Sequence, residues 1–244
     1  MVRDDRELSW ERFQQHEFPM PSPDLAPYVA RYWIAKWDYT QRYRQLIVPY
    51  PNVHLSFHHG GAEVHGVSSR HVFKELDGSG RVFGVAFRPG CFRAFLGGPV
   101  RAITDRCIPA AEVFRDLPDE AEVHTVERML RANLPARDPR AQLATEIVNR
   151  IIAEPGITRV DALAGQVAMS VRQLQRLFAD EVGVGPKWVI RRYRLHEVTE
   201  RMAAGARIDW AALAADLGYA DQAHFVRDFT TMFGESPTRY AERY

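Results

Sequence analysis

The sequence predicts an α+β protein in two parts: a mainly β domain, folded as a barrel or sandwich, and then an all-α domain. Three observations predict this class. Apolar and polar residues alternate up to about residue 115, whereas apolar residues recur at helical spacing from residue 119 onward. The last ninety residues also contain one motif twice, about fifty residues apart. This repeat predicts two helix-turn-helix units joined by a long helix.

The composition is that of a globular protein, and it excludes several other classes of protein. The chain has 244 residues, a net charge of +1 and 46% hydrophobic residues, which allow a sizeable core. Cys91 and Cys107 are the only cysteines, too few for a disulfide scaffold or a four-cysteine zinc module. No apolar run is long enough for a leader peptide or a membrane span, so we expect a cytoplasmic protein that does not bind membranes.

The first domain contains a predicted β-hairpin around Gly60-Gly61. Apolar and polar residues alternate over 53–58 and then meet the two glycines, which tolerate the positive φ of a type I′ turn. With these glycines as the turn, His58 pairs with Glu63. A further strand is expected over 81–90, where Pro89-Gly90 ends it.

Helices are predicted from residue 119 onward, and a short linker separates the two domains. One amphipathic helix ends at Pro135, and a second, with Leu143, Ile147 and Ile151 on its apolar side, ends at Pro155. The expected parts are an N-terminal domain over 1–135 with its closing helix at 119–134, a linker over 136–139, and a C-terminal domain over 140–244.

Two passages of the C-terminal domain match in their order of small, apolar and turn residues. They read LAGQVAMSVRQLQRLFADEVGVGP (163–186) and LAADLGYADQAHFVRDFTTMFGESP (213–237). Each predicts a short helix, a tight turn and a longer helix closed by glycine and proline, with the units at about 160–182 and 210–233. Gly218 suits the second turn, whereas Ala168 predicts a first turn that bends differently or is strained.

The longer helix of each unit has an apolar face and an opposite face that carries arginine. At about 100° per residue, Leu174, Leu177 and Phe178 point inward while Arg172 and Arg176 point outward. Arginine and glutamine read guanine and adenine edges in the major groove. A solvated helix face is the usual alternative, but two copies with matching turn, cap and outward arginine favour DNA binding. Two units are also too few for a helical solenoid.

Residues 140–244 resemble the DNA-binding domain of AraC/XylS-type bacterial transcription regulators, in which a long helix joins two helix-turn-helix units. The resemblance rests on MSVRQLQRLF, on PKWVIRRYRLHEV and above all on LAADLGYADQAHFVRDFTTMFGESPTRY. It implies that exposed side chains of both longer helices read bases. The candidate readers are Arg172, Gln173, Gln175, Arg176, Gln222, Ala223 and Arg227. The candidate contacts to the DNA backbone are Ser170, Lys187, Arg191, Arg192, Arg194, His224 and Thr230.

The resemblance also implies how the domain meets DNA. The two units are expected to enter neighbouring major grooves of double-stranded DNA, roughly 34 Å apart. The target is then an asymmetric site of about two helical turns. Ala223 and Val226 make the second helix a poor hydrogen-bonding reader, so we expect the first unit to set most of the sequence preference. For His224, a role in packing or phosphate binding is expected ahead of base reading.

The resemblance implies an N-terminal domain that senses a small molecule or dimerises, often a cupin-like barrel. Aromatic side chains of this part could line an effector pocket, although burial in a core or an interface is the more frequent role of such residues. The pocket candidates are Tyr28, Tyr32, Trp33 and Trp37.

Five histidines fall between residues 54 and 71 and raise the question of a metal site. His54, His58, Glu63 and His65 share one face of the predicted hairpin. However, His54 and His58 would stand about 13 Å apart along the strand, too far to share one ion, and the histidine pair typical of cupins is missing. We therefore expect a polar outer face with no metal and no cofactor, and His58 and His65 are the metal-binding candidates left open.

The predicted function is sequence-specific regulation of transcription, controlled by a small-molecule effector. The alternative is a ligand-independent regulator whose N-terminal domain only dimerises. No catalytic constellation can be placed, and two cysteines cannot supply the zinc domain of the alkyl-DNA repair methyltransferases that share this DNA-binding fold, so no enzyme activity is expected. The expected partners are double-stranded DNA, an effector, RNA polymerase in the case of an activator, and a second copy of the chain.

Overall fold

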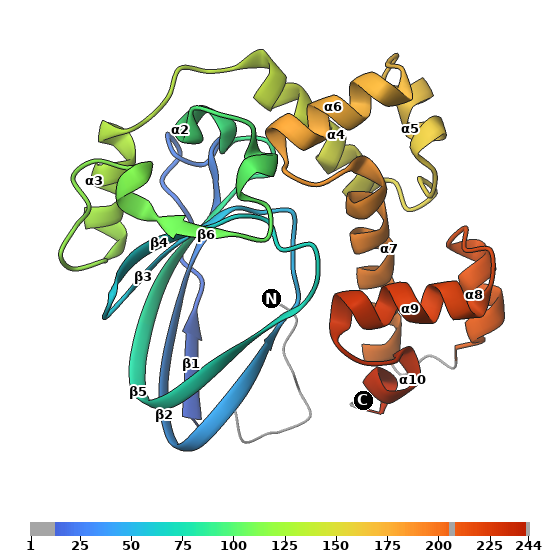
Figure 1. Ribbon diagram of the computed structural model, residues 1–244, viewed down its shortest axis with the longest axis horizontal. Helices are drawn as coiled ribbons and strands as arrows, with labels where there is room; N and C mark the ends of the chain where they lie inside the picture. The colour runs from blue at the N-terminus through green and yellow to red at the C-terminus, as the bar shows by residue number, and fades with distance from the viewer. Residues whose placement is uncertain (1–12, 205–207, 243–244) are drawn as a thin grey trace.

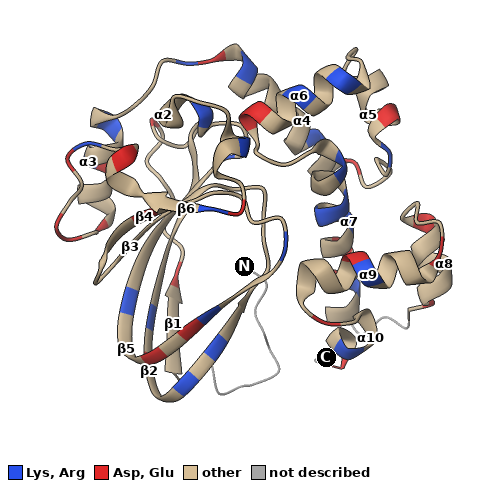
Figure 2. Ribbon diagram, viewed as in Figure 1, with Lys and Arg blue, Asp and Glu red and all other residues tan. Residues whose placement is uncertain are grey.

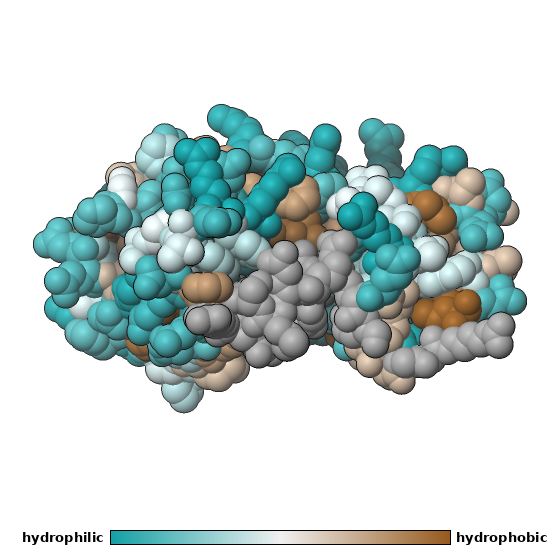
Figure 3. All heavy atoms as spheres, turned by 90° about the horizontal axis from the view of Figure 1, so that it is seen from below, coloured by the Kyte–Doolittle hydropathy of each residue, from teal (hydrophilic) through white to brown (hydrophobic). Residues whose placement is uncertain are grey.

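The computed structural model describes residues 13–204 and 208–242. It has a strand-rich part followed by a helical part, which confirms the α+β class. Figure 1 shows the curved sheet beside the helices, with the long helix α7 (Pro186–Ala203) connecting two helical units. Hydrophilic side chains predominate on the face shown in Figure 3. None of the helices in the described ranges is long and apolar enough to cross a membrane.

Six antiparallel strands form one sheet in the order β1-β2-β5-β3-β4-β6. The strands are β1 (Gln14–Glu17), β2 (Val29–Ile47), β3 (His54–His58), β4 (Gly61–His65), β5 (Val72–Phe87) and β6 (Cys107–Pro109). The long strands β2 and β5 pair along most of their length, and register shifts at 29–31 and 39–43 interrupt their ladder. The strand expected over 81–90 is thus the last part of β5. The expected barrel or sandwich takes the form of one curved sheet with β1 and β6 at its edges.

Two tryptophans of β2 cover glycines of β5. Trp33 stands opposite Gly84, and Trp37 stands opposite Gly80. A Cβ atom at Gly84 would lie 1.9 Å from Trp33 Cε2, and one at Gly80 would lie 2.2 Å from Trp37 Cζ2. Any side chain at either glycine would therefore displace an indole ring, so the two glycines are needed for a close approach.

The hairpin of β3 and β4 contains the predicted strands in a different register. Ser56 stands opposite Glu63, and His58 stands opposite Gly61, so the predicted pairing of His58 with Glu63 is wrong. The turn lies at residues 59–60 instead of 60–61. This change slides one strand by two residues along the other. Because side chains alternate with a period of two, an even shift leaves the same residues on each face of the hairpin.

Helix α3 (Val123–Ala132) packs against the buried face of the sheet. Phe83 of β5 belongs to the same hydrophobic cluster as Val126 and Leu130 of α3. The helix begins later than the expected start at residue 119, because a capping box formed by Glu122 and Thr125 fixes its first turn. Three short helices lie near the same end of the sheet: α2 (Arg93–Leu96), η1 (Val100–Ile103) and η2 (Ala110–Glu112).

The helical part contains both predicted helix-turn-helix units. Its other helices are α4 (Pro139–Ala153), α5 (Val160–Gln166), α6 (Val171–Glu181), α8 (Trp210–Asp216), α9 (Gln222–Phe233) and α10 (Pro237–Ala241). Helices α5 and α6 form the first unit, and α8 and α9 form the second. Leu143 of α4 is 38% exposed, so its expected inward position is wrong; Ala144 is buried instead. The backbone at Gly90 approaches this helix closely. A Cβ atom at residue 90 would lie 3.1 Å from Ala144 Cβ, so both positions need small residues.

The turns of the two units share one backbone conformation despite their different residues. Ala168 has φ +52° and Gly218 has φ +75°, so both lie in the left-handed region. Of the two possibilities left open by the sequence, the first turn is therefore strained rather than bent differently. Ala168 is exposed, and no packing contact requires its methyl group.

Two hydrophobic clusters organise the molecule, and α7 contributes to both. The first joins the sheet, α3, α4 and the first unit, and includes Val189 and Ile190 of α7. The second holds the second unit, together with Leu195 and Val198 of α7. Leu46 at the end of β2 also belongs to the second cluster. Both helix-turn-helix units therefore pack against the N-terminal part of the chain.

Arg192 of α7 is fully buried where the helix meets the loop after β2. Its Nε donates a hydrogen bond to the Pro49 carbonyl, and its guanidinium lies 3.9 Å from the centroid of the Tyr50 ring. The guanidinium also lies 5.6 Å from the centroid of the Phe233 ring. Burial lowers the pKa of Arg192. The expected phosphate contact of Arg192 is therefore wrong, because the side chain faces the N-terminal domain and is out of reach of solvent.

Single substitutions at the two turn residues, Ala168→Gly and Gly218→Ala, should change the free energy of unfolding in opposite directions. Ala168→Gly is expected to stabilise the protein by about 0.5–1 kcal/mol, because it removes about 1–2 kcal/mol of left-handed strain and adds about 0.4–1 kcal/mol of unfolded-state freedom. Gly218→Ala is expected to destabilise it by about 1 kcal/mol through the same strain, since a Cβ atom there meets Thr158 only at an ordinary 3.7 Å. Urea unfolding measures both. Equal unfolding free energies for Ala168→Gly and the wild type would contradict the strain.

Truncation of Arg192 should destabilise the whole protein rather than only weaken DNA binding. Arg192→Ala is expected to cost about 2–4 kcal/mol, because it removes the cation–π contact and leaves the buried Pro49 carbonyl without its donor. Lys187→Ala is the matched control on the same helix, because Lys187 is exposed; its unfolding free energy should stay within about 0.5 kcal/mol of the wild type. The structural role of Arg192 is refuted if both variants unfold at the wild-type urea concentration.

Candidate DNA-binding interface

The first recognition helix, α6, begins at a reciprocal capping box. Ser170 Oγ accepts a hydrogen bond from the Gln173 backbone N–H at 3.2 Å, and Gln173 Oε1 accepts one from the Ser170 backbone N–H at 2.8 Å. The Ser170 hydroxyl also lies 2.8 Å from this same oxygen. Two predicted DNA contacts, Ser170 and Gln173, thus have another role here: their side chains fix the start of α6.

Three predicted base readers of α6 stand free on its outer side. Leu174, Leu177 and Phe178 are buried on the opposite side, as the helical spacing predicted. The outer residues are Arg172, Gln175 and Arg176, all exposed and all without an ion pair or side-chain hydrogen bond to the rest of the described chain. Their polar groups are therefore available to a ligand from outside, such as a base edge.

The second recognition helix, α9, begins at Asp221, whose carboxylate accepts a hydrogen bond from the His224 backbone N–H at 2.6 Å. Its buried side is formed by Phe225, Phe229, Met232 and Phe233. Gln222, Ala223 and Arg227 are exposed. Arg227 has no ion pair or side-chain hydrogen bond within the described residues, and it occupies the place that Arg176 has on α6, two residues before a buried phenylalanine.

A polar cluster braces α9 against α7. Arg191 pairs with Asp228 at 2.8 Å, and its guanidinium lies 3.1 Å from His224 Nε2. The His224 ring makes an edge contact with Tyr219, and burial raises the pKa of that tyrosine well above its ordinary range. His224 therefore packs against Tyr219 and Arg191, and its contact with phosphate stays a prediction. Arg191 likewise holds the recognition helix in place and is only partly available for phosphate.

The basic residues of α7 divide between solvent and core. Lys187 is exposed, as a phosphate contact requires. Arg194 is only 2% exposed; it donates to the Ile151 carbonyl and pairs with Glu197 at 2.6 Å, so its expected phosphate contact is wrong. The reason is that α7 packs against other helices over most of its circumference. Thr230 of α9 donates its hydroxyl hydrogen bond to the Val226 carbonyl of its own helix, at 2.8 Å.

Acidic residues at the end of α6 form ion pairs with the N-terminal part of the chain. The helical periodicity of the sequence did not predict these partners. Glu181, whose side chain is fully buried, lies 3.4 Å from Arg93 and 3.1 Å from Arg140. Burial raises the pKa of Glu181, and the two arginines oppose that rise. Asp180 pairs with Arg101 of η1, which places the N-terminal domain directly behind the first recognition helix.

The second unit has its own contacts with the N-terminal part. The Trp188 indole N–H of α7 donates to the Ser69 carbonyl at 2.8 Å. The His71 backbone N–H donates to the Thr231 carbonyl of α9 at 3.2 Å, and its ring Nδ1 lies 2.8 Å from the same oxygen. The loop over 69–71 therefore touches both the connecting helix and the second recognition helix.

The four aromatic candidates for an effector pocket do not face a common space, so that prediction is wrong. Tyr32 points into the core, where it is fully buried beside Phe83 and its hydroxyl lies 3.3 Å from Glu127. Trp33 and Trp37 lie on the opposite face of the sheet, over glycines of β5. Successive side chains of a strand point to opposite faces, which separates neighbours in sequence. Tyr28 packs edge-on against the Phe95 ring of α2.

The histidine-rich face of the hairpin brings together groups that the predicted register had placed differently. His58 Nε2 lies 3.3 Å from Glu63, and His65 Nε2 lies 2.7 Å from the Ser56 hydroxyl. His54 accepts the Trp33 indole N–H at 3.3 Å, and burial lowers its pKa to about 3. Cys107 of β6 stands opposite His65 and joins this group, which the sequence did not predict. A cysteine 42 residues away gives no local signal, because only strand pairing brings it there.

Charge differs between the two units. Figure 2 shows basic residues on α6 and α7 and acidic residues around α8. Residues 208–237 contain a single basic residue, Arg227. Their acidic residues are Asp209, Asp216, Asp221, Asp228 and Glu235. The second unit is thus net acidic, although Asp228 pairs with Arg191 of α7 and Glu235 pairs with Arg239 of α10.

Two protein families match the two halves of the chain. A family model described as a helix-turn-helix domain matches residues 163–243. A domain of unknown function, DUF6597, matches residues 17–109. The first match includes part of α5 and all of α6 to α10, and the second runs from the last residue of β1 to the end of β6.

Curated relatives match part of the chain. The HTH-type transcriptional regulator Rv1931c of Mycobacterium tuberculosis is 33% identical over 89 residues, which are 36% of this chain and 34% of the relative. The RCS-specific HTH-type transcriptional activator RclR of Escherichia coli is 29% identical over 98 residues, 40% of this chain and 34% of the relative. The chain thus spans about a third of the length of these relatives.

Solved structures of similar proteins cover either less than half or most of the chain. A probable AraC family transcriptional regulator from Rhodopseudomonas palustris is 26% identical and matches 40% of this chain and 92% of its own, with a TM-score of 0.35. ToxT from Vibrio cholerae is 11% identical and matches 95% of this chain and 98% of its own, with a TM-score of 0.39.

The family model, the relatives and the geometry of the helices agree on the C-terminal part. Two capped recognition helices expose arginine at matching places, and one long helix joins their units. Residues 163–243 therefore form a helix-turn-helix domain of the AraC type.

Proposed function

We propose that this protein is a sequence-specific DNA-binding regulator of transcription. One observation carries the proposal: α6 and α9 each present an arginine with no partner in the described chain, two residues before a buried phenylalanine, on the side away from the core. Both curated relatives, each matching more than a third of this chain, are named as transcriptional regulators or activators. The proposal extends that role to this chain.

Base reading is assigned mainly to α6. Arg172, Gln175 and Arg176 can each make a bidentate contact with a base, arginine with guanine and glutamine with adenine. The capping box at Ser170 and Gln173 fixes the start of the helix and hence the place at which these three side chains enter the groove.

Base reading by α9 is expected to be weaker. Its outer face carries Gln222 and Arg227, but Ala223 adds no hydrogen-bonding group. The acidic residues around this unit repel the phosphates that flank the groove. We therefore propose that α9 contacts DNA mainly to orient the domain and specifies only a few base pairs, while α6 sets most of the base preference.

The N-terminal domain is proposed to set the geometry of the two units. It contacts the end of α6 through Arg101 and Arg93, and it contacts α7 and α9 through the loops at 49–50 and 69–71. A ligand that moves these loops would change how the two recognition helices fit adjacent grooves. Control by a small-molecule effector is proposed on this basis, and a ligand-independent dimerising role is the alternative.

Replacing Arg176 by alanine is expected to relax the base preference at one fixed position of the DNA site and to cost about 1–3 kcal/mol of binding free energy. Alanine cannot donate the two hydrogen bonds that the guanidinium makes to a guanine edge. Selection of binding sites from random duplexes, followed by titration of the selected duplex, measures both effects. Arg128→Ala, at an exposed arginine of α3, is the matched control and should return the wild-type motif. If Arg176→Ala returns that motif at wild-type affinity, Arg176 does not read a base.

Arg227→Ala should have a smaller effect than Arg176→Ala, by about 1 kcal/mol or more in binding free energy. The reason is that the neighbouring side chains of α9 add few base contacts and the unit is acidic. Fluorescence anisotropy with the duplex selected by the wild-type protein compares the two variants at one salt concentration. A loss for Arg227→Ala that equals or exceeds the loss for Arg176→Ala would reverse the proposed order of the two units.

A further inference from the structure

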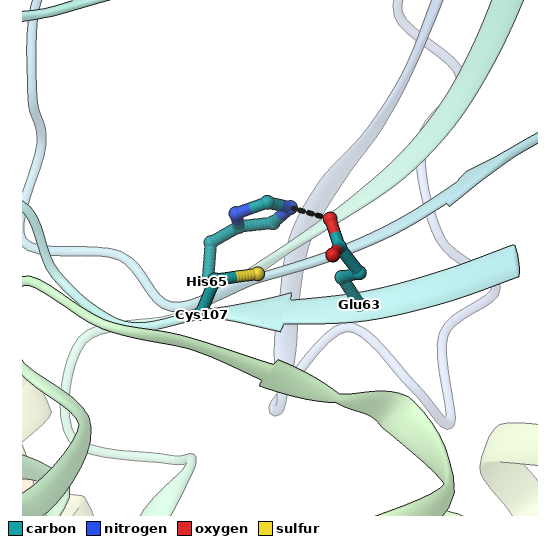
Figure 4. Close-up of side chains that lie close together, drawn as sticks. All are labelled: Glu63, His65 and Cys107. Atoms are coloured by element: carbon teal, nitrogen blue, oxygen red, sulfur yellow. Dashed lines mark ion pairs between the residues drawn. The ribbon is translucent and has the colours of Figure 1, made fainter. Parts of the chain in front are cut away.

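Three side chains with metal-binding groups meet at the edge of the sheet, outside both recognition helices. Glu63 and His65 lie on β4, and Cys107 lies on the edge strand β6. Figure 4 shows the three side chains converging from the two strands. The reading of DNA uses none of them.

Strand pairing fixes this arrangement. His65 and Cys107 stand directly opposite each other in the antiparallel pair of β4 and β6. Opposite residues place their Cβ atoms about 4.5–5.5 Å apart on the same face of a sheet. Glu63, two residues before His65 on the same strand, also lies on that face. The juxtaposition thus follows from the backbone and depends only in detail on side-chain rotamers.

The distances between the donor atoms suit a single ion after a small closure. One carboxylate oxygen, one imidazole nitrogen and the thiol sulfur all lie within 4.8 Å of one another, and His65 Nε2 is 3.8 Å from Glu63 Oε2. Ligands around a tetrahedral zinc ion, with bonds of about 2.0–2.3 Å, stand about 3.5 Å apart. A shift of about 1 Å at the exposed Cys107 side chain reaches this spacing.

The chemistry of the donors selects the ion. A thiolate and an imidazole are ligands of zinc and other transition metals, whereas magnesium and calcium prefer oxygen ligands alone. His58 lies beside the group, with Nε2 3.3 Å from Glu63 Oε2, and orients the carboxylate. The Ser56 hydroxyl lies 2.7 Å from His65 Nε2, and ion binding exchanges this hydrogen bond for a metal–nitrogen bond.

We propose that Glu63, His65 and Cys107 form a binding site for Zn²⁺, with a fourth position open to solvent. Cys107 is exposed, so the ion can enter directly from solvent. The site does not depend on the proposed DNA-binding function, because no recognition-helix residue takes part in it.

The test uses the full-length protein, freed of metal by a chelator and then titrated with Zn²⁺ against a chromophoric competitor. The wild type is expected to bind one equivalent. Cys107→Ser should weaken binding at least about 10-fold, since it removes one of three ligands. Cys91→Ser is the matched control: the Cys91 side chain is half-buried, lies near Pro27 and Thr145, and belongs to no metal-binding group in the described chain.

Co²⁺ provides a second reading of the same site. The wild-type protein with Co²⁺ should show the near-ultraviolet charge-transfer band of a thiolate ligand, and Cys107→Ser should lack it while Cys91→Ser keeps it. His65→Gln should lower the affinity for Zn²⁺, whereas His124→Gln, at an exposed histidine of α3, should leave it unchanged. Failure of the wild type to bind Zn²⁺, or wild-type affinity in Cys107→Ser, would overturn the proposal.

Discussion

The shared burial of α7 is the constraint on which the arrangement of this protein depends. Its first half packs in the cluster of the sheet and the first unit, and its second half packs in the cluster of the second unit. The two recognition helices are therefore placed relative to one another by one rigid element. Arg192 adds a polar contact from the middle of this helix to the Pro49 carbonyl and the Tyr50 ring, so the N-terminal domain takes part in the placement.

Each recognition helix divides its residues between holding the helix and meeting a ligand. On α6 the capping box and the buried leucines hold it, which leaves Arg172, Gln175 and Arg176 free. On α9 the cluster of Arg191, His224 and Asp228 performs the corresponding bracing, and fewer polar side chains remain on the outer face. The difference in the number of free polar side chains on α6 and α9 thus depends on capping and ion pairing as well as on the identity of the outer residues.

In the N-terminal sheet, successive side chains of each strand point to opposite faces, and this alternation decides which functional groups lie together. Tyr32 and Trp33 are neighbours in sequence but occupy opposite faces, so aromatic residues that appear as a group along the chain are separated in space. The reverse holds for His65 and Cys107, which are distant in sequence and adjacent across two strands. The aromatic residues close in sequence therefore form no common pocket, whereas His65 and Cys107 form a cluster that the sequence does not predict.

The sequence by itself determined the α+β class, the two units and the outward arginines, because periodicity, caps and turn residues act within a few residues of the chain. Tertiary structure decided which cations of α7 are available: Arg192 and Arg194 are buried, whereas Lys187 is exposed. It also decided the hairpin register and the partner of His65. These features depend on contacts between distant segments, and local patterns carry no information about which distant surface a side chain will meet.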